Sequence, residues 1–526
     1  MSKFNAFLER KFDLTNKGTT VKTEIVAGLT TFMAMVYILM VNAGMFADLG
    51  GIQSGAPTAK QFYNGVYIAT AISAVFGTIL IGLLAKLPLA QASGMGLNAF
   101  FVYTICGFGM MNGMTYANAL VFILLDGIVF LALTVTGLRK IIFNAIPDAV
   151  KVAIPAGIGL FIAFIGLQNA GIVVLDSSTK VALVSMNLLK DATYASLFPL
   201  FVTIAGVIAI AVLSHKNVKG AVLWGILGSA VLYYVFAAIG LIFSDAASKA
   251  IFEKISLDNP FTAFGDFFKY SFGQVFTEGF NFNTYLNGEY IAGFDAVSGA
   301  PIFGEKHSVA DLILLLVTGA FAFCIVDMFD TMGTLYGACA RGNLLDENGD
   351  IPNVNKAMFA DAAATCVGAI CGTSTVTTFV ESSAGIAEGG KTGLTSIVTG
   401  ICFFIAMFLT PIAQLIPTYA TAAALIYVGV LMMNCVLKID WFAPAKAVPA
   451  FMTIAMTVMT YSISYGIGFG LISYVAIQLF TGCFGKKEVK TVNEDGEEVV
   501  ATEKNGADIV TLVIALLFVA MFLFTH

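Results

Sequence analysis

Acidic residues inside apolar stretches are the side chains of this sequence best suited to chemistry. There are five of them: Asp126 in FILLDGIVF, Asp327 and Asp330 in FCIVDMFDTMG, Asp361 in MFADAAATC, and Glu381 in TFVESSAG. In a bilayer, each charge at the centre of a helix costs about 2.5 to 3.5 kcal/mol, so each acid is a candidate functional group. A carboxyl group can bind a proton, accept hydrogen bonds from N–H groups or bind a hard cation.

Spacing and neighbouring residues separate these acids into two groups. Asp327 and Asp330 are three residues apart and therefore lie on one face of a helix. Asp126 and Asp361 stand beside small residues, which favours an interpretation as polar bridges between neighbouring helices. For Asp327 and Glu381 we instead expect a role in a functional site.

A second motif with chemical meaning is GIAEGGKT at 385–392, which fits the G-x-x-x-x-G-K-[ST] pattern of a phosphate-binding loop. Such a loop needs a strand before it, a helix after it and a soluble α/β domain around it. The chain is 58% hydrophobic and only 11% charged, whereas a soluble domain has about 25% charged residues. We therefore interpret the chain as a polytopic membrane protein and the motif as part of a membrane segment.

Composition and motifs also exclude other classes. A net charge of −6 without a basic stripe excludes nucleic acid as a partner. The eight cysteines include no C-x-x-C pair and are interpreted as small core residues, so we expect no metal site and no cofactor. An intramembrane enzyme should contain H-E-x-x-H or G-x-S-x-G, and the sequence has neither. We expect a protein that is not an enzyme.

Apolar runs long enough to cross a bilayer core of roughly 30 Å recur along the chain. We expect about fourteen spans, near 24–46, 64–85, 95–107, 115–137, 147–170, 196–214, 219–243, 310–336, 356–372, 380–390, 392–416, 419–436, 447–464 and 466–483. A further apolar run lies at 508–525, and the sequence does not decide whether it also crosses the membrane. Every second short loop is basic, which predicts a cytoplasmic N-terminus and an extracellular 244–309 segment in the cell (plasma or inner) membrane. That segment forms either a folded cap or a lid.

Two segments differ from ordinary membrane helices. KLPLAQASGMGLNAFF at 86–101 and GTSTVTTFVESSAGIAEGG at 372–390 each place a small, polar, extended stretch before a short helix interrupted by glycine. Such backbone is tolerated at membrane depth only where it is buried or lines a cavity, and the positive ends of the half-helices then face the ligand. Asn98 and Glu381 occupy matching places in the two segments. The alternative is that the glycines only permit close helix packing.

An internal similarity suggests two inverted halves. Residues 200–234 and 450–480 share a helix, a short polar or glycine turn and a second helix that ends in aromatic residues. Seven spans separate the two copies, and an odd number places them in opposite orientations. Chance similarity between apolar segments is the alternative. We predict an all-α polytopic membrane protein with two inverted repeats of seven helices.

Three strings carry a family resemblance: GMGLNAFF, VDMFDTMGTLYG and TSTVTTFVESSAGIAEGGKTGLTS. They resemble the purine-permease branch of the nucleobase/cation symporter family, and the similarity extends from 28–42 to 465–474. The resemblance implies proton-coupled import of hypoxanthine, guanine or adenine. It also implies a fold of fourteen helices in a core domain and a gate domain, with a short strand before helix three and helix ten.

The resemblance also implies that Asn98, Asp327 and Glu381 match substrate-contacting positions and that Asp330 matches a second acid important for transport. The expected substrate-binding residues are Asn98, Asp327, Glu381, Phe379, Gly96 and Ser382, and the expected proton-coupling residues are Asp327 and Asp330. Ala43, Asp126 and Lys391 differ from the residues usual in the branch, where Pro, Glu and Arg are common. The expected partners are a purine nucleobase, a proton and the lipid bilayer, with a homodimer left open. Sodium is the competing coupling ion.

The expected domains follow the same division. They are 1–23 as cytoplasmic N-terminus, 24–137 and 310–416 as core domain, 138–243 and 417–485 as gate domain, 244–309 as extracellular loop, and 486–526 as polar linker and C-terminal apolar segment. The main alternative function is an anion carrier of the same fold class, of the sulfate or bicarbonate kind. Several acids and no Arg or Lys at membrane depth argue against it, because an anion would meet like charge.

Overall fold

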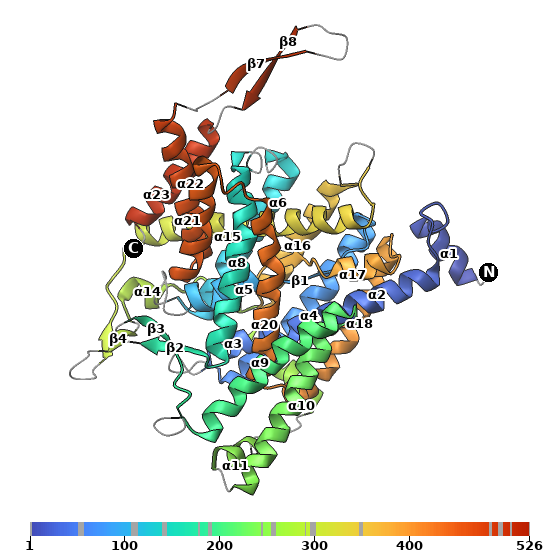
Figure 1. The fold of residues 1–526 in the computed structure, drawn as a ribbon, viewed down its shortest axis with the longest axis vertical. Coiled ribbons are helices and arrows are strands. Elements are labelled where there is room, and N and C mark those ends of the chain that lie inside the picture. Colours follow the sequence, from blue (N-terminus) through green and yellow to red (C-terminus); the bar gives the residue numbers. More distant parts are fainter. Residues whose placement is uncertain are drawn as a thin grey trace.

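Helices form most of the computed structural model of the chain (Figure 1). The structure describes residues 3–50, 57–106, 114–138, 142, 145–176, 179–187, 192–243, 246–253, 259–289, 291–294, 301–346, 351–482, 486–492, 498–504 and 508–524. Within these residues, ten helices are long and apolar enough to cross a membrane, and three shorter apolar helices accompany them. The prediction of a polytopic helical protein is confirmed.

The long helices coincide with the spans expected from hydropathy. They are α2 (Val21–Met35) continued by α3 (Tyr37–Ala47), α4 (Ala59–Leu84), α6 (Tyr116–Thr136), α8 (Asp148–Asn169), α9 (Tyr194–His215), α10 (Ala221–Ile242), α15 (Val309–Arg341), α18 (Gly393–Ala406) with α19 (Thr410–Ala413), α20 (Thr418–Met432) and α22 (Ile463–Phe480). The other predicted spans correspond to α5 (Met95–Ala99), α16 (Val354–Cys371), α17 (Ser382–Ala387) and α21 (Pro444–Met459). A short α1 (Lys3–Phe12) precedes them.

Outside the long helices, the chain forms short elements. A hairpin of β2 (Val173–Asp176) and β3 (Lys180–Leu183) connects α8 to α9. The 244–309 segment contains α11 (Ala246–Glu253), α12 (Pro260–Tyr270), α13 (Gln274–Thr277), α14 (Asn283–Asn287), β4 (Ile291–Phe294) and β5 (Pro301–Phe303). Part of it is fixed to the membrane helices, because Asn64 of α4 donates to Asp266 of α12 at 2.7 Å and the Gly273 amide donates to the Ile370 carbonyl at 2.8 Å.

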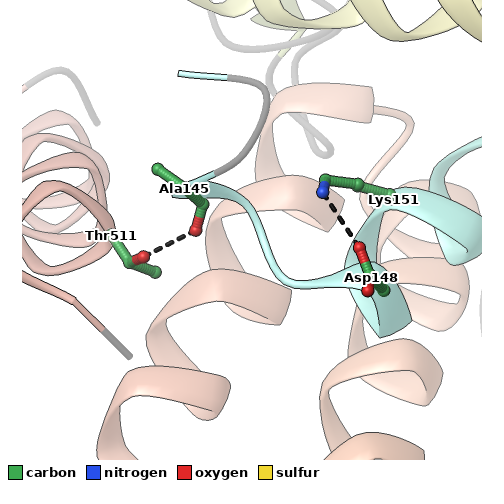
Figure 2. Close-up of polar contacts among 4 residues, drawn as sticks. All are labelled: Ala145, Asp148, Lys151 and Thr511. Carbon is green, nitrogen blue, oxygen red and sulfur yellow. Dashed lines mark hydrogen bonds and ion pairs between the residues drawn. The ribbon is translucent and has the colours of Figure 1, made fainter. Parts of the chain in front are cut away.

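The C-terminal region adds a hairpin and a last helix. Strands β7 (Lys486–Val492) and β8 (Glu498–Lys504) pair where a polar linker was expected, and the hairpin extends away from the helices in Figure 1. The helix α23 (Ile509–Phe524) packs on α22 and α15. In Figure 2 the buried Thr511 hydroxyl donates to the Ala145 carbonyl at 2.6 Å, and Lys151 pairs with Asp148 in the first turn of α8. The last helix is thus tied to the chain just before α8.

Candidate substrate-binding site

Two short strands meet and pair at the centre of the candidate site, and we call this place the strand crossing. Strand β1 (Gln91–Ser93) pairs antiparallel with β6 (Val376–Thr378), and the Phe379 amide extends the ladder to the Ala90 carbonyl at 3.0 Å. All six strand residues are buried. Extended backbone within a bilayer needs hydrogen-bond partners, and each strand supplies those of the other. The polar, small residues of both segments thus form extended structure, as their composition predicts.

Each strand leads into a short helix. After β1, α5 continues as a π-helix over Phe100–Ile105, and after β6 the chain forms the six-residue α17. Because the strands are antiparallel, the two helices begin at opposite ends of the strand pair. This arrangement is the strand and broken helix expected twice in an inverted repeat, and it places Asn98 and Glu381 near the crossing.

The Asn98 amide is oriented by its own strand. The Ser93 hydroxyl donates to Asn98 Oδ1 at 2.7 Å, and Asn98 Nδ2 makes a long bond of 3.4 Å to the Ser93 carbonyl. The Thr373 hydroxyl lies 3.1 Å from the Ser93 hydroxyl and so links Asn98 to the second strand segment. Asn98 is fully buried. Its weakly engaged Nδ2 group is available to donate a stronger hydrogen bond to a ligand.

Glu381 stands immediately before α17 and is held by a tyrosine from another helix. The Tyr37 hydroxyl of α3 donates to Glu381 Oε1 at 2.7 Å. Tyr37 is fully buried, whereas Glu381 is half-buried. The Ser382 hydroxyl accepts from the Ala90 amide at 3.0 Å and thereby fixes the start of α17 to the first strand segment. Tyr37 was not identified from sequence, because a tyrosine in YILMVN resembles any other core aromatic residue.

The helix α15 brings two acids to the same region. Asp327 is fully buried, and its Oδ2 atom accepts from the Thr365 hydroxyl at 3.2 Å. Its Oδ1 atom has no hydrogen-bond partner among the described residues. Asp330 lies beside Thr377 of β6, whose hydroxyl can donate to it, and near Glu381. Asp327 and Asp330 therefore lie on the part of α15 that approaches the strand crossing.

The two remaining acids differ from each other. Asp361 accepts from Gln91 Nε2 at 2.9 Å, from Thr331 at 2.8 Å and from Thr378 at 3.4 Å, so it joins α16 to α15 and to both strands. This is the bridging role expected for it. For Asp126 the same expectation is not met, because neither carboxyl oxygen has a hydrogen-bond partner among the described residues. Gln91 was not identified from sequence as a partner of any acid.

Two further expected site residues, Gly96 and Phe379, are buried. A Cβ atom on Gly96 would lie 2.4 Å from Ile158 Cγ2, so glycine permits α5 to approach α8 at this position. Phe379 is 5% exposed and lies directly after β6. The nearby Phe100 ring packs against Phe323 with centroids 4.8 Å apart. Close packing, which was the alternative reason for the glycines, therefore applies at Gly96 at least.

The stretch that resembles a phosphate-binding loop surrounds a carboxylate of the chain itself. Glu24 of α2 is fully buried and accepts from the Lys391 amide at 2.9 Å and from the Thr392 hydroxyl at 2.8 Å. It also accepts from the Thr395 amide at 3.1 Å and hydroxyl at 2.7 Å. An acidic side chain is favourable at a helix N-terminus, here that of α18. The stretch joins two membrane helices, as composition predicts.

Replacing Glu24 with Ala is expected to lower the apparent melting temperature of the detergent-solubilised protein by several degrees. The substitution leaves buried amide and hydroxyl donors without an acceptor, at a cost of about 3 kcal/mol or more. Glu24→Gln keeps one acceptor oxygen and should have a smaller effect. Glu253→Ala, at an exposed acid, is the control. A melting temperature for Glu24→Ala equal to that of the control would contradict the structural role of Glu24.

The polar groups around the crossing include carboxyls, hydroxyls and the side-chain amides of Asn98 and Gln91. Such a set favours a neutral ligand rich in N–H groups over an anion. Apolar membrane helices, two broken helices joined through paired strands and acids at membrane depth together define a membrane transporter, not an enzyme.

The chain belongs to the xanthine/uracil permease family: the family model, described as "Permease family", matches residues 22–469. It is 34% identical to the adenine permease AdeQ of Escherichia coli, with 90% of this chain and 91% of that protein covered. It is 36% identical to the guanine/hypoxanthine permease PbuO of Bacillus subtilis, with 90% and 94% covered. The resemblance drawn from the sequence motifs is confirmed.

Solved structures share the fold at low sequence identity. The transmembrane domain of the cyanobacterial bicarbonate transporter BicA is 15% identical with a TM-score of 0.52, covering 85% of this chain and 97% of that one. The murine anion transporter Slc26a9 in the inward-facing state is 12% identical with a TM-score of 0.53, covering 95% and 76%. At these identities the comparison establishes the fold alone.

Proposed function

We propose that this protein is a proton-coupled secondary active importer of purine nucleobases such as hypoxanthine, guanine or adenine. The proposal rests on the position of Glu381. This residue precedes a broken helix, accepts a hydrogen bond from Tyr37, and lies near Asp330 and the strand crossing. Relatives named adenine and guanine/hypoxanthine permeases support the choice of purines.

Substrate recognition follows from the functional groups of these residues. The Glu381 carboxylate can accept hydrogen bonds from two N–H groups of a purine edge. Asn98 can donate to one ring acceptor and accept from one ring N–H. An anion would instead meet the like charges of Glu381, Asp327 and Asp330, which disfavours the anion-carrier alternative.

Energy coupling is assigned to the acids of α15. Import against a concentration gradient needs an ion, and Asp327 is the proposed proton carrier, with Asp330 one turn along the helix as its partner. A buried carboxyl group can alternate between its protonated and ionised forms as water reaches it from one side of the membrane and then from the other. Sodium would need several hard oxygen ligands around it, and so it is the second choice.

The movement that exposes the site is proposed to occur between core and gate domains. The proposed core comprises 24–137 and 310–416, and the proposed gate comprises 138–243 and 417–485. Packing supports this division, since α4 contacts α16 and α18, whereas α8 contacts α20 and α21. Asn98, Asp327 and Glu381 would then move together as parts of the core.

A binding panel tests the substrate class. Purified protein should bind hypoxanthine, guanine or adenine more tightly than uracil and should not bind sulfate, measured by competition with a radiolabelled purine. Competition by sulfate at the same concentrations as a purine would favour the anion-carrier alternative. Competition by uracil alone would place the substrate among pyrimidines.

Membrane orientation gives a separate prediction. A cysteine at Thr277, which is exposed in the 244–309 segment, should react with an impermeant thiol reagent added outside intact cells. A cysteine at His215, beside Lys216, should react only after the cells are opened. Both are placed in a variant without reactive native cysteines. Labelling of His215→Cys but not Thr277→Cys in intact cells would reverse the orientation.

A further inference from the structure

Asp126 is a buried acid to which the proposed mechanism so far gives no role. It lies within the membrane-spanning α6, is fully buried, and has no hydrogen-bond partner for either carboxyl oxygen among the described residues. An ionised carboxylate in such a place would be strongly destabilising, because nothing replaces its lost hydration. We therefore expect the Asp126 carboxyl group to be protonated in this conformation.

The neighbouring residue shows where α6 approaches α16. A Cβ atom on Gly127 would lie 2.6 Å from Cys366 Sγ and 3.3 Å from the Ala362 carbonyl. Glycine is needed here because α6 and α16 are nearly in backbone contact. The same stretch of α16 contains Thr365, whose hydroxyl donates to Asp327. Asp126 and Asp327 thus both lie near one turn of α16.

The ionisable groups near Asp126 come from two helices. They are the carboxyl groups of Asp327 and Asp361 and the thiols of Cys324 and Cys366, on α15 and α16. Asp361 is held by three hydrogen bonds, whereas one oxygen of Asp327 is free of any partner among the described residues. Two carboxyl groups that interact in a medium of low dielectric constant do not readily ionise together.

We propose that Asp126 and Asp327 share the coupling proton, which stays on Asp126 while Asp327 is ionised and available to the substrate. The Thr365 hydroxyl stabilises the ionised form of Asp327 in this state. One O–H bond forms when the pair takes a proton from external water, and one breaks when the pair releases it to internal water. The inference rests on the proposed proton coupling and adds a residue on α6 to it.

The sharing of one proton explains how Asp327 can serve both substrate and proton. If Asp327 alone carried the proton, it would lose its acceptor capacity at one oxygen when it was protonated. When Asp126 is the second carboxyl group of the pair, the two residues bind one proton together, and the pH dependence of proton binding is a property of both residues. When both carboxyl groups are ionised they repel each other, and this repulsion favours proton binding. Removing Asp126 removes the repulsion.

Asp126→Asn should move the pH midpoint of hypoxanthine uptake lower by about one unit, because Asp327 alone binds the proton less tightly. Proteoliposomes with an inward proton gradient are the assay. Accumulation at neutral external pH should fall by about tenfold, whereas substrate exchange without a gradient should remain near the wild-type rate. Asp126→Glu should restore the midpoint. Asp126→Ser serves for the same measurement if the Asn variant does not fold.

Thr134→Val is the matched control, because Thr134 also lies on α6 and its hydroxyl is likewise without a partner among the described residues. It should keep the wild-type midpoint. An unchanged midpoint and unchanged accumulation in Asp126→Asn would overturn the inference. A wild-type protein whose uptake ignores the proton gradient would instead overturn the proposed function, so the two failures are distinguishable.

Discussion

Glu381→Gln is expected to weaken purine binding by about two orders of magnitude or more. The substitution replaces one acceptor oxygen by an NH₂ donor. A site that accepts two purine N–H groups then loses one hydrogen bond, and the new NH₂ group faces a purine N–H donor. The affinity of the purified variant for hypoxanthine, measured by radioligand binding, gives the size of the loss.

Two variants make the Glu381 result specific. Tyr37→Phe removes the hydroxyl that holds Glu381 Oε1 and should cause a smaller loss, since the carboxylate itself remains. Glu388→Gln alters an acid just past the other end of α17, which pairs with Lys219 at 2.7 Å, and should leave affinity unchanged. Wild-type affinity in Glu381→Gln would remove this residue from the binding site.

Asp327→Asn is expected to abolish uphill accumulation driven by a proton gradient. The asparagine resembles a permanently protonated aspartate and cannot exchange a proton with water on either side of the membrane. Proteoliposomes in sodium-free buffer with an inward proton gradient provide the measurement. The extent of substrate exchange that remains reports how far Asp327 also holds the purine.

The control for Asp327 lies on the same helix. Asp311→Asn changes a half-buried acid in the first turn of α15, which accepts from the Ser308 hydroxyl at 2.7 Å, and should retain accumulation. If the Asp327→Asn protein still concentrates hypoxanthine under these conditions, Asp327 does not couple transport to protons, and the assignment of the coupling site fails.

Much of the architecture could be predicted because membrane depth restricts what a sequence can contain. The small, polar residues in 86–101 and 372–390 predict extended backbone that is buried or lines a cavity, because few other structures of such segments are tolerated in a bilayer. The structure forms β1 and β6 there. Asp327 and Asp330 could be placed on one face from their spacing alone. The low content of charged residues was enough to reject the hypothesis that GIAEGGKT forms a nucleotide-binding loop.

The partners of the site residues could not be predicted, because they are far apart in the chain. Tyr37 and Glu381 are 344 residues apart, and Gln91 and Asp361 are 270 apart. No local pattern indicates which hydroxyl or amide will meet which acid. The same reason applies to Asp126: small neighbours predicted a polar bridge, but whether a partner reaches the carboxyl depends on the packing of α6 against α15 and α16.

The apolar run at 508–525 and the 244–309 segment show a second reason why the sequence did not predict the whole structure. Hydropathy identified the apolar run at 508–525, but whether it crosses a membrane depends on packing as well as length. The structure forms a helix of 16 residues, about 24 Å long, which packs on α22 and α15. Charge patterning likewise assigned 244–309 to one side of the membrane, while its docking on α4 depends on contacts such as Asn64 with Asp266.

We propose that this permease uses a proton gradient to concentrate a purine. The most direct test of this coupling is uptake of radiolabelled hypoxanthine, guanine and adenine into sodium-free proteoliposomes that contain the wild-type protein, with and without an inward proton gradient. We expect at least one purine to accumulate above its external concentration only when the gradient is present, and to leak out when a protonophore is added. Equal uptake of these purines with and without the gradient would contradict proton-coupled import.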